Sequence, residues 1–178
     1  MGLSHSTVTV GNFDIGPCQV LFNAVDLGGT LKNVAIKFKY EKSPLMADQF
    51  GKTILDMAVS GMDITVATEL AETRDKAKFA AIFPSGLLAG TSPHQYIDFK
   101  DQTALRQLAL AQVLVLHPLV DASSSLDNEW YFFKSLPLED GTYTFGPATQ
   151  ASLHVTWRIL LDTSVTPARM MRVGDHTL

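Results

Sequence analysis

The sequence has little of what several classes of protein require. It holds one cysteine, Cys18, among 178 residues, so no disulfide can form within the chain and nothing in it requires an oxidising compartment. Its 14 basic residues are outnumbered by 18 acidic ones. The formal net charge of −4 argues against tight binding of nucleic acid, which needs clustered lysine and arginine.

Long apolar runs are also missing. The longest apolar stretch, residues 108–116, is interrupted by Gln112 and is too short to cross a bilayer as a helix. The first residues carry neither the basic nor the apolar region of a secretory signal, so we expect folding in the cytoplasm without a membrane. A hydrophobic share of 46% and a charged share of 18% fit one globular domain over residues 1–178. Residues 1–16 and 163–178 are expected to be terminal arms.

The main signal is an alternation of apolar and polar residues, which is typical of strands with one buried face. It runs through residues 31–41, 62–70 and 153–161. In the last segment the apolar residues are Leu153, Val155, Trp157, Ile159 and Leu161, and the polar ones between them include His154, Thr156 and Arg158. A helix would distribute these polar residues around its circumference, so the pattern predicts an antiparallel β structure.

Weaker signals predict the remaining elements. Shorter strands are expected over residues 18–24, 53–60, 104–116 and 129–136. A hairpin is expected at Ser60-Gly61, which separates two alternating runs. One helix is expected over residues 73–83, capped by Thr73 and ended by Pro84, with an apolar face for the sheet made of Phe79, Ile82 and Phe83. The predicted fold class is therefore mainly β: an antiparallel β-sandwich or barrel with one flanking α-helix.

No set of residues indicates catalysis. The five histidines lack the paired spacing of a metal site, and no Walker loop or nucleophile elbow occurs. Residues 26–30, Asp-Leu-Gly-Gly-Thr, resemble the phosphate-binding element of actin-like ATPases and sugar kinases. That superfamily needs two large domains and further motifs, so a glycine turn between two strands is the preferred interpretation. We expect no enzyme and no cofactor, and a small phosphate-binding enzyme stays as an alternative.

Several segments, in their order along the chain, resemble the tail tube (major tail) proteins of long-tailed bacteriophages. The similarity begins at residues 24–30, a glycine turn before the long strand over residues 31–41, and continues through residues 47–53 with an Asp-Gln-x-Gly element. Residues 60–72 resemble the family's next hairpin and the start of its single helix. Residues 114–119 and 155–162 resemble its later strands.

The resemblance implies a tail-tube-like fold, six subunits in a ring, and rings stacked into a tube. The implied partners are other copies of the chain, the tape measure protein, the tail terminator, tail-tip or baseplate proteins, and genome DNA that passes non-specifically through the lumen. The implied location is the tail of the virion, assembled in the bacterial host cytoplasm. The inner tube of a contractile tail, a terminator ring and a monomeric ligand-binding β-barrel stay open as alternatives.

Two sets of residues are candidates for assembly. Residues 42–52 are expected to form a projecting loop that contacts the next ring, through Pro44, Leu45, Met46, Asp48, Gln49 and Phe50. The polar faces of the two strands beside Ser60 are expected to line the channel, through Asp56, Asp63, Thr65 and Glu69. Carboxylates suit a DNA channel because they repel phosphate. Lys37 and Lys39 also lie on a polar face, where they would pair with these acids or lie at the rim.

Overall fold

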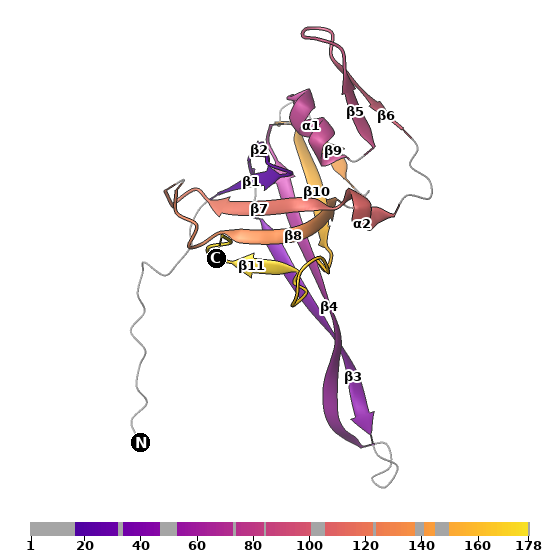
Figure 1. The fold of residues 1–178 in the computed structure, drawn as a ribbon. Coiled ribbons are helices and arrows are strands. Elements are labelled where there is room, and N and C mark those ends of the chain that lie inside the picture. The colour runs from indigo at the N-terminus through magenta and orange to yellow at the C-terminus, as the bar shows by residue number, and fades with distance from the viewer. Residues whose placement is uncertain are drawn as a thin grey trace.

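The computed structural model describes residues 17–31, 34–46, 53–72, 74–83, 85–100, 106–122, 124–137, 141–144 and 150–177. These residues are mainly β and the sheets are antiparallel, as the sequence predicts (Figure 1). The elements are β1 (Cys18–Phe22), β2 (Val25–Gly29), β3 (Ala35–Met46), β4 (Ile54–Leu70), α1 (Lys76–Ile82), β5 (Gly86–Ala89), β6 (Tyr96–Phe99), α2 (Gln107–Leu110), β7 (Gln112–Pro118), β8 (Trp130–Pro137), β9 (Thr142–Thr144), β10 (Ser152–Ile159) and β11 (Met171–Val173).

The main sheet has the strand order β2-β1-β7-β8-β10-β4-β3, with β11 paired to β8 and β9 paired to β10. Over the described residues it does not close into a barrel, although a bridge between Thr30 and Leu70 joins the end of β2 to the end of β4. Strands β5 and β6 form a separate hairpin beside α1. In Figure 1 this hairpin and the long β3–β4 hairpin project from opposite ends of the molecule.

The core lies inside a bend of the main sheet. Trp157 on β10 and Phe22 on β1 have ring centroids 4.5 Å apart, although β7 and β8 separate their strands in the sheet order. The sheet therefore curls back on itself. Trp157 is fully buried, and its indole N–H donates to Thr68 Oγ1 on β4 at 3.2 Å, which satisfies the polar atom of the indole inside the core. The alternation predicted for residues 62–70 and 153–161 is largely confirmed, because Ile64, Val66, Leu70, Leu153, Val155, Trp157 and Ile159 are all buried, whereas Leu161 is exposed. The buried face predicted for residues 31–41 is wrong in its outer part, since Phe38 and Tyr40 are exposed where β3 leaves the body.

The hairpin predicted at Ser60-Gly61 is wrong. Strand β4 runs unbroken through these residues, and the adjacent Glu41 and Lys42 of β3 lie opposite Gly61 and Val59. Ser60 is therefore the extra residue of a β-bulge. A glycine beside a small polar residue suits a bulge as well as a turn, so the local sequence does not separate the two. The hairpin instead reverses between Met46 and Ile54.

The predicted helix is present but begins later than expected. Its N-cap is Asp75, whose Oδ1 accepts from the backbone N–H of Ala77 at 2.9 Å. Thr73, the predicted cap, lies outside the described residues. The predicted apolar face is confirmed, since Ile82 is buried and both Phe79 and Phe83 pack against the core.

The strand predicted over residues 104–116 is correct only in its second half. Residues 107–110 form the short helix α2, and β7 begins at Gln112. Leucine and alanine favour the helix there, whereas the valines at 113 and 115 favour the strand. The chain thus has two helices among its described residues, where one was expected.

The turn between β1 and β2 carries a backbone strain that can be tested. Asn23 and Ala24 have φ values of 51° and 61°. Positive φ at both positions suits a type I′ turn, which favours Asn followed by Gly, and an alanine in this region costs about 1–2 kcal/mol.

Replacing Ala24 by glycine should raise the free energy of unfolding by about 1 kcal/mol, because Ala24 is exposed and little packing is lost. Denaturant unfolding checks this. The matched control is Ala67→Gly inside β4, which should lower the free energy of unfolding by up to about 1 kcal/mol. Equal effects of the two substitutions would argue against strain at the turn.

Candidate functional site

The outer half of the β3–β4 hairpin stands in solvent. Every residue from Lys37 to Met46 is exposed, and so is every residue from Ile54 to Ser60. From Gly61 onward β4 enters the main sheet, where it pairs with β3 on one edge and β10 on the other, and alternate residues become buried. One strand therefore runs from solvent into the core.

This projecting hairpin carries large apolar side chains that remain half exposed or more. Seven of them have exposed fractions of 50–61%: Tyr40, Leu45, Met46, Ile54, Leu55, Met57 and Val59. A contiguous exposed apolar surface of this kind is typical of a site of interaction with another molecule.

Most of these side chains share one side of the hairpin. Residues directly opposite each other on paired strands point to the same side. The register places Val59 opposite Lys42, Met57 opposite Pro44, and Ile54 opposite Met46. We call this surface the apolar side of the hairpin: Tyr40, Lys42, Pro44, Met46, Ile54, Met57 and Val59. Lys42 is the one charged residue among these seven.

The loop predicted over residues 42–52 is wrong for the part that the structure describes. Pro44, Leu45 and Met46 belong to strand β3. Proline is tolerated there because β3 is the edge strand of the sheet, where a missing N–H breaks no ladder. In the sequence, the Ser43-Pro44 pair and the lack of apolar–polar alternation around it indicated a loop. Asp48, Gln49 and Phe50 lie outside the described residues.

The four residues proposed for a channel lie on the other side of the same ribbon. Asp63, Thr65 and Glu69 alternate with buried residues of β4. Between Gly61 and Leu70 the odd-numbered residues of β4 point to this side. The extra residue Ser60 shifts the alternation by one, so beyond the bulge the even-numbered Asp56 points to the same side. We call this surface the polar side of the hairpin. Its residues continue onto β10 through Arg158, which lies opposite Thr65.

The polar side pairs cations with carboxylates rather than presenting acids alone. Arg158 donates to Asp63 Oδ2 at 3.3 Å, and Lys39 lies directly opposite Asp63. Glu69 Oε1 accepts from Ser152 at 2.7 Å. This side holds three cations, Lys37, Lys39 and Arg158, and four carboxylates, Glu41, Asp56, Asp63 and Glu69. Its formal charge is therefore −1, which is close to balance.

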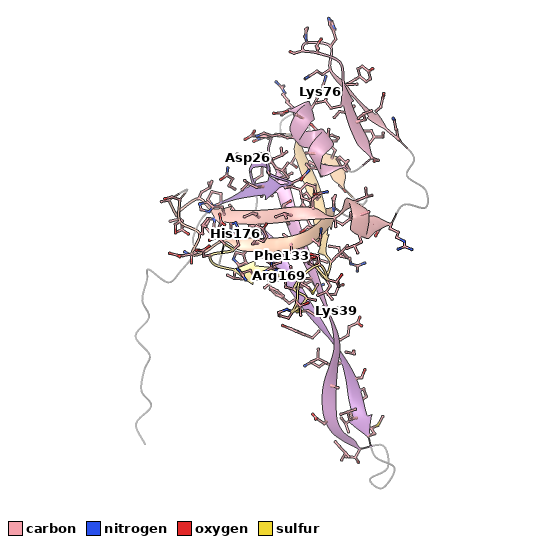
Figure 2. All side chains as sticks on the ribbon, viewed as in Figure 1. Asp26, Lys39, Lys76, Phe133, Arg169 and His176 are labelled. Carbon is pink, nitrogen blue, oxygen red and sulfur yellow. The ribbon has the colours of Figure 1, made fainter. Side chains whose placement is uncertain are left out.

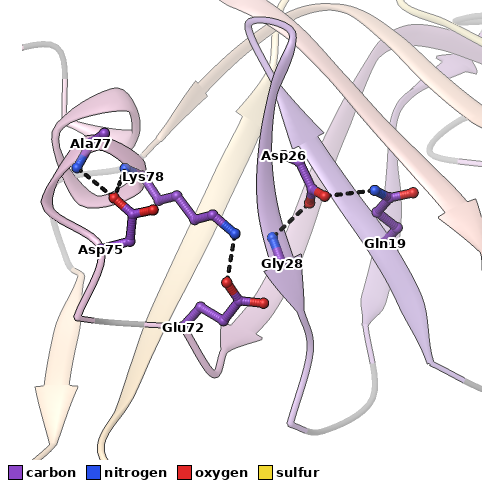
Figure 3. Close-up of polar contacts among 7 residues, drawn as sticks. All are labelled: Gln19, Asp26, Gly28, Glu72, Asp75, Ala77 and Lys78. Carbon is purple, nitrogen blue, oxygen red and sulfur yellow. Dashed lines mark hydrogen bonds and ion pairs between the residues drawn. The ribbon is translucent and has the colours of Figure 1, made fainter.

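The glycine motif at residues 26–30 is part of strand β2 rather than a phosphate loop. Asp26 uses both carboxylate oxygens locally, accepting from Gly28 N at 2.8 Å and from Gln19 at 2.7 Å (Figure 3). Gly28, at φ +87°, lies against Glu72, because an added Cβ would come within 2.3 Å of Glu72 Oε1. Glu72 pairs with Lys78 at 2.5 Å, and this hydrogen bond raises the pKa of Lys78. Two carboxylates beside these glycines disfavour a phosphate there.

A second polar cluster holds the C-terminal segment against the sheet. Buried Glu129 lies 3.0 Å from His117 Nδ1 and, through its other oxygen, 3.1 Å from His176 Nδ1. The ring of His176 stacks on Tyr131 with centroids 4.3 Å apart. Glu129, Tyr131 and His176 also line a cavity of about 400 Å³, together with Leu21, Val113, Val115 and the β1–β2 turn. The three ionisable residues are far apart in the chain, so no sequence pattern could have found them.

Residues 163–177 are therefore not the free arm that the sequence predicts. Strand β11 pairs with β8, and the Arg169 guanidinium lies 3.9 Å from the centre of the Phe133 ring (Figure 2). The segment contains only a short apolar run, Met170-Met171, which is too weak a signal for a strand. The predicted N-terminal arm, residues 1–16, lies outside the described residues.

Within the described ranges, no group of three or more histidine, cysteine, aspartate or glutamate side chains is arranged to hold a metal ion. Over the same ranges, no helix has the length and apolar character needed to cross a membrane. The chain matches no protein-family model and no curated protein. The exposed hairpin is thus the feature of the described structure that most needs a functional explanation.

Glu129→Ala should lower the free energy of unfolding by about 2–3 kcal/mol, since it removes a buried carboxylate that faces two imidazoles. Denaturant unfolding measures the loss, and hydrogen exchange should show lower protection over residues 171–177. The control is Glu72→Ala, which removes a half-exposed ion pair and should cost less than about 1 kcal/mol. Equal losses would show that the Glu129 cluster does not hold the C-terminal segment.

Proposed function

We propose that the chain is a structural subunit of a bacteriophage tail tube, in which copies form stacked hexameric rings around a channel for genome DNA. The observation that carries the proposal is the projecting β3–β4 hairpin with its apolar side in solvent. The order of the tail-tube-like segments in the sequence supports the same function. In an assembly, the curled sheet would form the tail-tube-like sandwich of each subunit.

The size of the exposed apolar surface supports assembly over a monomeric state. Covering the remaining exposed area of a half-exposed apolar side chain contributes about 1 kcal/mol. The five such side chains that lie on the apolar side, Tyr40, Met46, Ile54, Met57 and Val59, would contribute on the order of 5 kcal/mol before the cost of association is subtracted. A two-stranded hairpin is marginally stable by itself in water, so contact with a neighbour would also hold its outer half in shape.

The edge of β3 favours contact through side chains rather than by addition of a strand. Lysines and proline on an edge strand discourage pairing with another chain. Strand β3 carries Lys37, Lys39, Lys42 and Pro44 along its length. The neighbouring subunit would therefore cover the apolar side of the hairpin instead of extending its ladder.

The polar side of the hairpin suits the wall of the channel. A surface whose cations are slightly outnumbered by carboxylates gives DNA phosphates no cluster of lysine and arginine to bind, so it lets DNA pass. The other partners in this proposal are the tape measure protein, the tail terminator and the tail-tip or baseplate proteins of the virion.

Replacing Ile54, Met57 and Val59 together by serine should prevent tube formation and leave the body folded, because these side chains are exposed in the single chain. Sedimentation velocity and negative-stain electron microscopy measure assembly, and circular dichroism checks the fold. The matched control replaces Leu119 and Val120 by serine, because these two side chains are 51% and 64% exposed but lie outside the hairpin. This control should still form tubes. Normal tubes from the triple variant would contradict the proposal.

Replacing Asp63 and Glu69 by lysine should allow tubes to form but slow the ejection of genome DNA, because five cations would then face two carboxylates on the polar side. Ejection rates from virions measure this, and the defect should decrease at higher salt. Asp121 and Asp127 replaced by lysine give the same charge change in a loop away from the hairpin. If the Asp63 and Glu69 variant forms no rings, the polar side is a subunit interface and not the channel wall.

A further inference from the structure

A second apolar surface lies at the other end of the molecule, on the β5–β6 hairpin (Figure 1). One side of this hairpin packs on α1, where the Phe99 ring lies 5.8 Å from Phe83 and 6.4 Å from Phe79. Leu87 and Tyr96 occupy the other side and are 51% and 54% exposed. We call this side, made of Leu87, Ala89, Tyr96 and Asp98, the free side of β5–β6.

The β5–β6 hairpin is held in position on the body. Lys76 at the start of α1 (labelled in Figure 2) donates to the backbone carbonyl of Gln95. Gln95 immediately precedes β6. At the base of the hairpin, Lys100 N donates to the Ser85 carbonyl at 3.1 Å. These contacts attach the hairpin to α1 and close its base, and such attachment lowers the entropy lost when a partner binds the free side.

The charges on the two hairpins are complementary. Among the described residues of the apolar side of β3–β4, the one charge is Lys42, which lies opposite Val59. Within β5 and β6 the one charge is Asp98, which lies opposite Leu87. Two β3–β4 hairpins that met by their apolar sides would bring Lys42 of both copies into one interface, which disfavours self-pairing.

The two surfaces cannot meet within one chain because they project from opposite ends of it. We propose that the free side of β5–β6 in one copy receives the apolar side of the β3–β4 hairpin of the next copy, with Lys42 paired to Asp98. This inference rests on the proposed function and names the surface that covers the hairpin. The contact is head to tail, so each added copy presents a new β3–β4 hairpin and the stack stays open for growth. Open growth fits a tube better than a single terminator ring.

A charge exchange tests the pairing. Lys42→Glu and Asp98→Lys should each raise the protein concentration needed for assembly by about tenfold, because each variant opposes like charges in the contact. The variant with both substitutions should return to within about threefold of the unchanged protein, since the pair is restored in reverse. Sedimentation velocity across a range of concentrations measures the threshold. The matched control combines Lys39→Glu with Asp98→Lys. Its assembly threshold should stay raised, because Lys39 lies on the polar side and cannot pair with residue 98 in this contact.

The outcomes separate this inference from the proposed function. If the double variant assembles no better than the single ones, or if the single ones assemble normally, the pairing of Lys42 with Asp98 is overturned. Should the Ile54, Met57 and Val59 variant still fail to assemble in that case, the proposed function stands and the hairpin docks elsewhere. Normal assembly of that triple variant as well would overturn both.

Discussion

The structure depends on strand β4, which is anchored in the core at one end and exposed at the other. Residues Ile64 to Ala67 pair with β3 on one edge and β10 on the other, residues 68–70 continue along β10, and every second side chain from Ile64 to Leu70 is buried in the core. The outer residues continue the same strand, so they cannot turn back to cover their apolar side chains without breaking the ladder. The sheet therefore keeps the apolar side of the hairpin exposed to water. An exposed apolar surface of this kind is typical of contact with a second molecule.

The parts of the fold that depend on period-two alternation could be predicted from the sequence. Trp157 and Val66 lie in long alternating runs, and both are buried as expected. The prediction failed at residues whose type is common in two different backbone structures. Ser60-Gly61 forms a bulge instead of a turn, and Pro44 lies in an edge strand instead of a loop. In both places the tertiary position in the sheet decides the local structure, and a short window of sequence does not contain it.

The candidate site could be predicted in part, for the same reasons. The four residues Asp56, Asp63, Thr65 and Glu69 were identified by their polarity, and the structure brings them to one side of the ribbon. The pairing of Asp63 with Arg158 and its position opposite Lys39 depend on the register of three strands, which the sequence alone does not specify. The contact of Glu129 with two histidines was missed because it joins the ends of β7 and β8 to the C-terminal segment. Such non-local contacts leave no spacing motif.

The two hairpins project from opposite ends of the molecule, so a contact between them in successive copies is head to tail. A head-to-tail contact that does not close into a ring extends until free subunits are exhausted or a capping protein binds the end. The most direct test is electron cryomicroscopy of the purified full chain at concentrations where it assembles. The account predicts stacked rings with the outer half of the β3–β4 hairpin buried between successive copies. Particles that remain single chains at every concentration, or assemblies in which this hairpin stays in solvent, would contradict it.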